Sequence, residues 1–173
     1  MTTNRNPFRQ PILSHRQVVQ KIKRIAFEVL ERNFYEKHLW IAGVEGMGYT
    51  IAKMLKDELR QISLLDVHLV KIFINKNSPS LQEVSLDVRT ADLDGKVVVV
   101  VDDVLNTGRT LAYSMKPFFG VKISRLQVAV LVDRNHRNFP VAADYVGYAL
   151  STTINQHISV EMNEAGEMAV YLD

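Results

Sequence analysis

The sequence contains no cysteine, which excludes disulfide bonds and thiolate chemistry and makes a cytoplasmic location the default expectation. It also lacks an apolar run of about 18 residues, the length that a membrane-spanning helix needs, so we expect no membrane contact. The first eleven residues carry Arg5 and Arg9 with no apolar stretch behind them, and they are not expected to form a secretory signal.

Neither sign of charge dominates. The chain has 21 Lys and Arg against 19 Asp and Glu, a formal net charge of +2, which is too small to indicate nucleic-acid binding by itself. Its 173 residues, 47% of them hydrophobic, suffice for one well-buried core, whereas two would be crowded. Because no repeat, low-complexity tract or linker divides the chain, we predict one domain over residues 1–173.

The most informative segment is residues 97–111, VVVVVDDVLNTGRTL. Its five valines indicate a strand buried on both faces, as inside a parallel sheet. We expect this strand to end at Asp102 and Asp103, where open α/β sheets bind ligands. The turn at residues 107–110 precedes an apolar-periodic segment, so its hydroxyl and backbone N–H groups are suited to a phosphate. The segment therefore has hydrogen-bond acceptors for sugar hydroxyls beside hydrogen-bond donors for a phosphate. This combination favours a phosphorylated sugar as the ligand. The alternative, an acidic strand end that binds Mg²⁺ alone, leaves residues 107–110 unexplained.

Hydrophobic spacing elsewhere predicts alternating helices and strands. Ser14 and Gln17 form a capping-box pattern before a helix that extends to about Asn33. The alternation predicts an α/β fold with a mainly parallel central sheet, helices on both faces and late antiparallel additions. The other expected elements are strands at 39–42, 67–74 and 126–132, a glycine loop at 43–48, a helix around 51–59, a polar loop at 75–80, an edge arm at 81–88, a helix from about 108 that kinks near Pro117, and a hairpin of 157–162 with 167–172.

Residues 99–110 resemble the phosphoribosyl diphosphate (PRPP) signature of the type I phosphoribosyltransferases: an apolar strand, two acidic residues, two apolar residues, one variable residue and Thr-Gly-x-Thr. The resemblance implies the type I phosphoribosyltransferase fold with a small base-binding hood. It implies that Asp102 and Asp103 are the catalytic carboxylates that hold the ribose hydroxyls, and that they meet Mg²⁺ mainly through PRPP. The residues implied to hold the 5′-phosphate are Asn106, Thr107, Gly108, Arg109 and Thr110.

Residues 131–140 and 143–147, with parts of the first helix, resemble the pyrimidine operon attenuator and uracil phosphoribosyltransferase family, PyrR. The likeness covers most of the chain and weakens at about 75–94 and after 151. It implies transfer of a phosphoribosyl group from PRPP to uracil or a related pyrimidine, giving UMP and pyrophosphate with Mg²⁺ as cofactor. It also implies a homo-oligomer, and an RNA hairpin as a partner of some members. The hood would comprise about 133–173 plus N-terminal parts, and residues 1–13 would form an arm.

Two loops depart from the family pattern. The pyrophosphate loop reads Glu45, Gly46, Met47, Gly48 where relatives carry Thr-Arg-Gly, so a cation is missing and a carboxylate is present. This should weaken pyrophosphate binding, unless Glu45 points away or meets Mg²⁺. The alternative interpretation is that Gly46 and Gly48 merely make a turn. The Arg-Asp pair that begins the family's mobile loop is absent from residues 73–77, where Lys76 is either a substitute cation or a solvated surface lysine. We therefore expect reduced catalytic efficiency or a changed substrate.

The residues expected near the base indicate a pyrimidine. Asn106 stands where purine enzymes commonly carry an aspartate as proton acceptor, and an amide cannot act as a base. The candidate base-binding residues are Val132, Asp133, Arg134 and Tyr145. The alternatives are a surface ion pair for Asp133 and Arg134, and core packing for Tyr145.

Basic residues offer a candidate RNA-binding surface. They are Lys23, Arg24 and Arg32 on the first helix, with His136 and Arg137 in a later loop. A solvated helix face is the alternative. The chain has fewer basic residues here than RNA-binding relatives tend to have, which would reduce the contribution of counterion release to the affinity for RNA. Two alternatives to the enzyme stay open: a nucleotide-sensing RNA-binding regulator, and a catalytically weakened relative that only binds nucleotides.

The remaining histidines, His15, His38, His68 and His157, show no metal-ligand spacing along the sequence and are interpreted as surface or packing residues.

Overall fold

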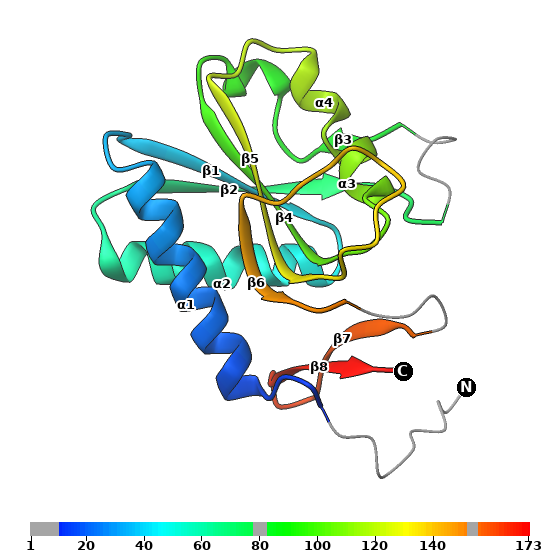
Figure 1. The fold of residues 1–173 in the computed structure, drawn as a ribbon. Helices are drawn as coiled ribbons and strands as arrows, with labels where there is room; N and C mark the ends of the chain where they lie inside the picture. Colours follow the sequence, from blue (N-terminus) through cyan, green and yellow to red (C-terminus); the bar gives the residue numbers. More distant parts are fainter. Residues whose placement is uncertain (1–10, 78–82, 152–155) are drawn as a thin grey trace.

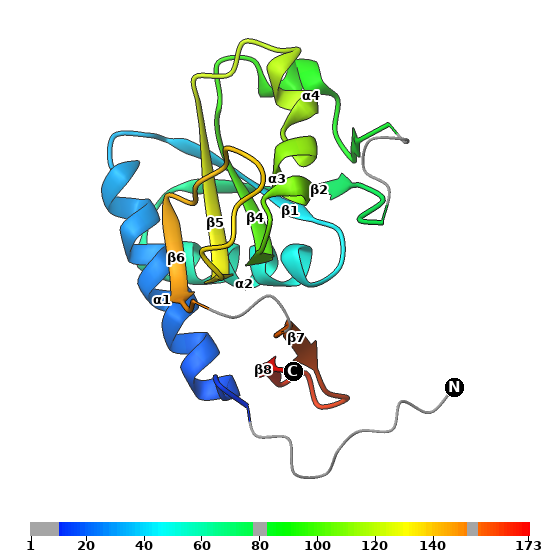
Figure 2. The same ribbon diagram turned by 45° about the vertical axis from the view of Figure 1, so that its right-hand side comes forward.

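The computed structural model describes residues 11–77, 83–151 and 156–173. Most of the predicted N-terminal arm, half of the predicted polar loop and the start of the edge arm lie outside these ranges. Figures 1 and 2 show a central sheet with helices on both sides. The elements in order are α1 (His15–Arg32), β1 (His38–Val44), α2 (Met47–Ile62), β2 (Asp66–Phe73), β3 (Ser85–Leu86), the 3₁₀ helix η1 (Thr90–Leu93), β4 (Val97–Leu105), α3 (Arg109–Ser114), α4 (Lys116–Phe119), β5 (Arg125–Asp133), β6 (Tyr145–Ala149), β7 (Ile158–Met162) and β8 (Met168–Leu172).

The main sheet has the strand order β3-β2-β1-β4-β5-β6. Neighbouring strands pair in parallel except β3, which is antiparallel to β2 at the edge. This confirms the predicted α/β fold with a mainly parallel sheet. The chain moves outward from β1 to β2 and then returns to place β4 on the other side of β1. The order of the strands therefore reverses between β1 and β4, the point at which such sheets bind ligands.

The valines of β4 contribute to both layers of the core. Val97, Val99 and Val101 belong to the cluster that includes residues of α1 and α2, whereas Val98 and Val100 belong to the cluster that includes Leu111 of α3 and Phe118 of α4. All five valines are at most 1% exposed. Side chains alternate between the two faces of a strand, so an unbroken apolar run is what a strand covered on both sides requires.

Local signals also match the helix boundaries. Ser14 and Gln17 form the predicted capping box: the Ser14 backbone N–H donates to Gln17 Oε1 over 2.8 Å, and the Ser14 side chain accepts from the Gln17 N–H. The helix after β4 breaks at Met115, and α4 restarts with Pro117 in its first turn, where proline is tolerated. None of the helices in the described ranges is long and apolar enough to cross a membrane.

A second, two-stranded sheet lies beyond the carboxyl ends of the main strands (Figure 2). It is the predicted terminal hairpin of β7 and β8, and Leu13 bridges to Val170 of β8. Residues 145–149, by contrast, form β6 of the main sheet, although the predicted hood of 133–173 included them. This strand was not predicted, because Gly147 interrupts its apolar pattern. The glycine is needed there, since a Cβ would lie 2.5 Å from the Leu131 carbonyl oxygen.

Candidate functional site

The candidate site lies where β1 and β4 are adjacent. The loop after β1 is shorter than predicted, since β1 continues to Val44 and α2 begins at Met47. The first turn of α2 consequently packs directly on β4. A Cβ on Gly48 would lie 2.8 Å from Asp102 Oδ1 and 3.0 Å from Asp102 Cα, so only glycine permits this approach. The start of α2 and the acidic pair therefore form one continuous surface.

The two carboxylates lie within β4, which continues to Leu105, so the prediction that the strand ends at them is wrong. The Asp103 N–H donates to Asp102 Oδ1, and the Val104 N–H donates to Asp103 Oδ1, each over 2.9 Å. Asp102 is 2% exposed, whereas the Asp103 side chain is 20% exposed. Burial, and then the neighbouring Asp103, raise the pKa of Asp102 to about 8. Burial and the neighbouring carboxylate therefore favour the protonated form of Asp102.

Lys76, which follows β2, covers this acidic pair. Its Nζ lies 3.3 Å from Asp102 Oδ1 and 3.8 Å from Asp103 Oδ1. Burial works to lower the pKa of Lys76, but the charges of the two carboxylates and the hydrogen bonds to them outweigh it, so the pKa lies above its ordinary value. Lys76 is therefore a cation at the candidate site, and it is exposed to solvent while it pairs with the two carboxylates.

The loop from Asn106 to Thr110 is held from behind by the segment after β5. The Thr107 carbonyl accepts from the N–H groups of Asn138 and Phe139, over 2.9 and 3.0 Å, and Thr107 Oγ1 accepts from the Arg109 N–H over 3.3 Å. Gly108 has φ +83°, a conformation that favours glycine. The structure thus brings together all five residues predicted to hold a 5′-phosphate. They surround a small hollow that is lined by Asp102, Val104 and residues 105–111.

The glutamate of the pyrophosphate loop is neutralised within the chain. Glu45 Oε1 lies 3.0 Å from Lys71 Nζ on β2. Gly46 has φ +94° and precedes α2, so it makes the turn that was the alternative interpretation of this loop. Met47 starts the helix and is half-buried against the core cluster of α1 and α2. The expected repulsion of pyrophosphate by Glu45 is reduced by this ion pair, while the position of Met47 still provides no cation.

The predicted base-binding residues at the end of β5 and directly after it are engaged within the protein. Val132 is fully buried in the core. Asp133 accepts two hydrogen bonds of 2.6 Å from Arg137, and Arg134 donates to Asn106 Oδ1 over 3.0 Å and to the Gln156 carbonyl over 2.7 Å. Asp133 and Arg134 are 8% and 6% exposed, so the surface ion pair that was their alternative is wrong. Arg134 instead joins the phosphate loop to the segment that leads into β7.

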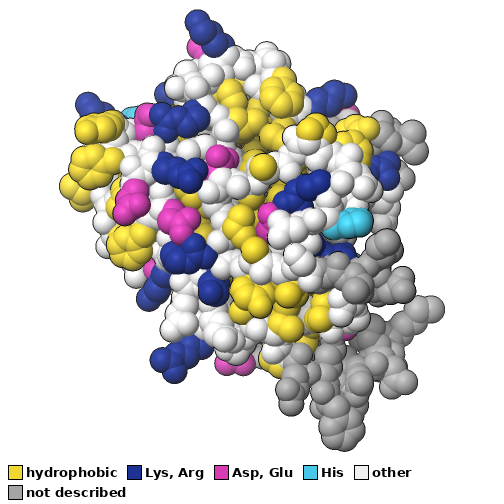
Figure 3. Space-filling view, in the orientation of Figure 1, with side chains coloured by type: hydrophobic (Ala, Val, Ile, Leu, Met, Phe, Trp, Pro, Cys, Tyr) yellow, Lys and Arg dark blue, Asp and Glu magenta, His cyan; other side chains and the backbone are white. Residues whose placement is uncertain are grey.

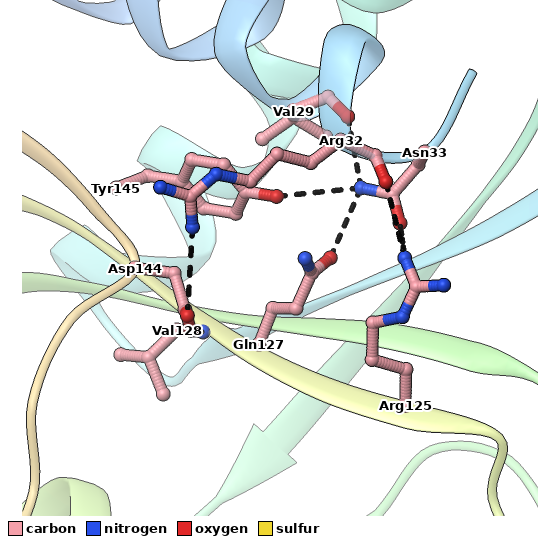
Figure 4. A network of polar contacts seen from close by, with 8 residues as sticks. All are labelled: Val29, Arg32, Asn33, Arg125, Gln127, Val128, Asp144 and Tyr145. Atoms are coloured by element: carbon pink, nitrogen blue, oxygen red, sulfur yellow. Dashed lines mark hydrogen bonds and ion pairs between the residues drawn. The ribbon is translucent and has the colours of Figure 1, made fainter.

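Tyr145 is a core residue. It begins β6 opposite Ala129, four positions before Ala149, which pairs with Asp133. Its ring is fully buried, and its hydroxyl lies 3.4 Å from Asn33 Nδ2 (Figure 4). The prediction that Tyr145 packs on the base is therefore wrong. The same asparagine binds Gln127 and Arg125, so a polar network joins the end of α1 to β5 at the amino end of the sheet.

The basic residues proposed for RNA are partly used inside the molecule. Arg24 donates to the carbonyls of Val146 and Gly147, each over 2.8 Å, and pairs with Glu28. Arg137 is held by Asp133, and Arg32 lies 3.7 Å from Asp144. Lys23 is exposed and His136 half-buried. Figure 3 shows Lys and Arg side chains over α1 with Asp and Glu among them, rather than a uniformly basic face.

The sequence of this chain matches a known family and several curated proteins. The model of the phosphoribosyl transferase domain family matches residues 10–165. The bifunctional protein PyrR of Bacillus pumilus is 34% identical over 173 residues, covering 92% of this chain and 96% of the relative. The pyrimidine operon regulatory protein of Lactococcus lactis subsp. lactis is 33% identical over 159 residues, covering 90% and 91%.

Solved structures show the same fold. The hypoxanthine phosphoribosyltransferase of Trypanosoma cruzi superposes with a TM-score of 0.76 at 19% identity, covering 94% of this chain and 95% of that one. A hypoxanthine-guanine phosphoribosyltransferase from Bacillus anthracis gives 0.73 at 21% identity, with 94% and 97% coverage. From the family match and the sequence relatives, the chain belongs to the phosphoribosyl transferase domain family, and its relatives in sequence are PyrR proteins.

Proposed function

We propose that this chain transfers the phosphoribosyl group of PRPP to uracil, giving UMP and pyrophosphate. The observation that carries the proposal is the hollow that Asp102 lines together with the loop of residues 106–110, with Asp103 next to Asp102 in β4. Carboxylate oxygens accept hydrogen bonds from ribose hydroxyls, and the N–H and hydroxyl groups of the loop donate to the 5′-phosphate. One ligand spanning both sets of groups would be a ribose 5-phosphate unit.

The pyrophosphate of PRPP would lie over the first turn of α2. This is a 16-residue helix whose first N–H groups have no acceptor within the helix, and its dipole favours an anion. Lys76 supports the same placement, because its ammonium group is already adjacent to the acidic pair and can turn toward the departing pyrophosphate. Lys76 would then supply the cation that Met47 does not.

The acidic pair fits Mg²⁺, since hard carboxylate oxygens are the ligands that this ion prefers. Asp103, the more exposed of the two, would meet it, mainly through oxygens of PRPP. The ion would neutralise charge on the pyrophosphate as the bond to C1′ breaks. The residues of the chain supply position: Asp102 and Asp103 fix the ribose, and the phosphate loop fixes its 5′ end, so that the base reacts in a defined orientation.

Asn106 supports a pyrimidine rather than a purine. Its amide oxygen accepts from Arg134 over 3.0 Å, and an amide cannot take a proton from a purine ring. We expect UMP formation from uracil and no nucleotide formation from hypoxanthine. Turnover of hypoxanthine would contradict this assignment of the base.

The direct test measures UMP and pyrophosphate with PRPP, Mg²⁺ and uracil. Asp103→Asn should abolish turnover, whereas Asp57→Asn, the same change at an exposed position of α2, should not alter it. Met47→Arg restores the family's cation and should raise turnover. No turnover by the wild-type chain that still binds PRPP or UMP would identify the catalytically weakened relative instead.

RNA binding is the second candidate function, and the exposed Lys23 on α1 favours it together with the relatives named as regulators of the pyrimidine operon. Because Arg24 and Arg137 are held by internal contacts, the salt dependence of binding to a leader RNA hairpin should be shallower than five phosphate contacts would give. No binding at low salt would eliminate this function.

A homo-oligomer is proposed from the family resemblance. Phe34, Tyr35 and Leu64 are large apolar side chains that are at least 70% exposed in the single chain. Light scattering coupled to size-exclusion chromatography measures the mass of the native protein. A monomer at assay concentration would contradict this proposal.

A further inference from the structure

Three side chains with metal-binding atoms meet at the amino ends of β1 and β2, away from the acidic pair. His38 begins β1, and Asp66 and His68 lie at the start of β2. Parallel pairing places His38 opposite Asp66 and Trp40 opposite His68, so all of these side chains project from the same face of the sheet. The two histidines are 30 positions apart in sequence, which is why spacing along the chain did not reveal them.

Two of the three separations between donor atoms are already close to the separation that a metal ion imposes. Asp66 Oδ2 lies 3.1 Å from His38 Nδ1 and 3.0 Å from His68 Nε2, and the three ligand atoms lie within 4.8 Å of one another. In tetrahedral Zn²⁺ sites, with bonds of about 2.0–2.1 Å, neighbouring ligand atoms are about 3.3 Å apart. Small side-chain rotations would therefore suffice to admit the ion.

Trp40 holds one of these ligands in place. Its ring stacks on the His68 imidazole with centroids 4.5 Å apart and an interplanar angle of 20°. Trp40 is itself half-buried against the core layer that includes residues of α3 and α4, and this packing restricts the position of its ring. The stacking limits rotation of the imidazole and leaves its Nε2 directed at Asp66.

We propose that His38, Asp66 and His68 form a Zn²⁺ site, with a water or an added ligand in the fourth position. Two imidazoles and one carboxylate suit Zn²⁺, whereas Mg²⁺ prefers oxygen ligands and would favour the acidic pair of β4. The His38 and Asp66 side chains are 54% and 58% exposed, so the ion can enter from solvent. The bound ion would cross-link β1 and β2 at the end opposite the phosphoribosyl site.

The competing account is that Asp66 merely accepts hydrogen bonds from both histidines. The variant His38→Asn/His68→Gln separates the two accounts, because it keeps an amide N–H near the position of each imidazole nitrogen but removes both metal ligands. His157→Asn is the matched control, since His157 is exposed and lies outside the cluster.

The test uses the full chain without an affinity tag, stripped of metal and titrated with Co²⁺ as the spectroscopic probe. We expect one equivalent of Co²⁺ to give the intense visible absorption of a tetrahedral site in the wild type and in His157→Asn. Zn²⁺ should displace it and raise the melting temperature. The double variant should show neither effect.

Weak absorption typical of octahedral Co²⁺, or equal absorption in the double variant, would overturn the proposal. The readout needs no PRPP and no turnover, so its failure is independent of the proposed enzymatic function.

Discussion

Replacing Asp102 with asparagine would test the environment of the acidic pair without any ligand. Asparagine has the shape of a protonated aspartate, and its Oδ1 can still accept from the Asp103 N–H, as Asp102 Oδ1 does over 2.9 Å. The substitution therefore removes the ionisation of this side chain while keeping the packing of Gly48 against it. Lys76 retains Asp103 as a partner, 3.8 Å away.

The sign of the effect follows from the raised pKa. Between the ordinary value of 3.8 and the folded value of about 8, the unfolded chain has lost the proton of Asp102 while the folded protein retains it. Wild-type stability must then fall as pH rises through this interval, by about 1.4 kcal/mol per pH unit at most. Between about pH 5 and about pH 8 the loss from Asp102 would reach at most about 4 kcal/mol, and Asp102→Asn should not suffer it.

Urea unfolding at several pH values measures this difference. The free energy of unfolding of Asp102→Asn minus that of the wild type should increase by at least about 1 kcal/mol from about pH 5 to about pH 8. Asp57→Asn, the exposed control, should follow the wild-type pH profile. Parallel profiles for Asp102→Asn and the wild type would refute the conclusion that burial keeps Asp102 protonated.

Three further substitutions address single contacts. Gly48→Ala should lower stability by about 1–3 kcal/mol in urea unfolding and weaken PRPP binding at least about tenfold in calorimetry, because its Cβ would meet Asp102 Oδ1 at 2.8 Å and backbone atoms at 3.0 Å. An affinity for PRPP equal to that of the wild type would contradict this. Tyr145→Phe should cost about 1 kcal/mol of stability through its 3.4 Å contact with Asn33 and leave the KM for uracil unchanged, whereas a raised KM would return Tyr145 to the base site. Lys76→Met should raise the KM for PRPP in steady-state assays, and an unchanged KM would show that Lys76 does not meet pyrophosphate.

The parts of the fold that depend on local chemistry could be predicted from the sequence. A run of valines specifies a strand buried on both faces, and the capping box and Pro117 specify where helices begin and break. The phosphate loop could be located because Thr-Gly-x-Thr after two acidic residues is a contiguous motif. These signals need no knowledge of what lies on the neighbouring strands.

The contacts that depend on strand pairing could not be predicted in the same way. Lys76 reaches the acidic pair because β2 and β4 flank β1, and the histidine cluster forms because β1 and β2 pair in register. Tyr145 was misassigned since β6 was missed, and its burial depends on α1 and β5. One general signal was available for Lys76: in a parallel sheet, the residues after each strand gather at one edge.

Calorimetric titration of PRPP with Mg²⁺ measures whether the carboxyl end of β4 binds a phosphorylated ribose. The wild-type chain and Asp57→Asn should each bind one PRPP per chain, while Asp103→Asn and Thr107→Val should lose most of the affinity. Equal affinity in all four proteins, or no binding by the wild type, would contradict the assignment of this site.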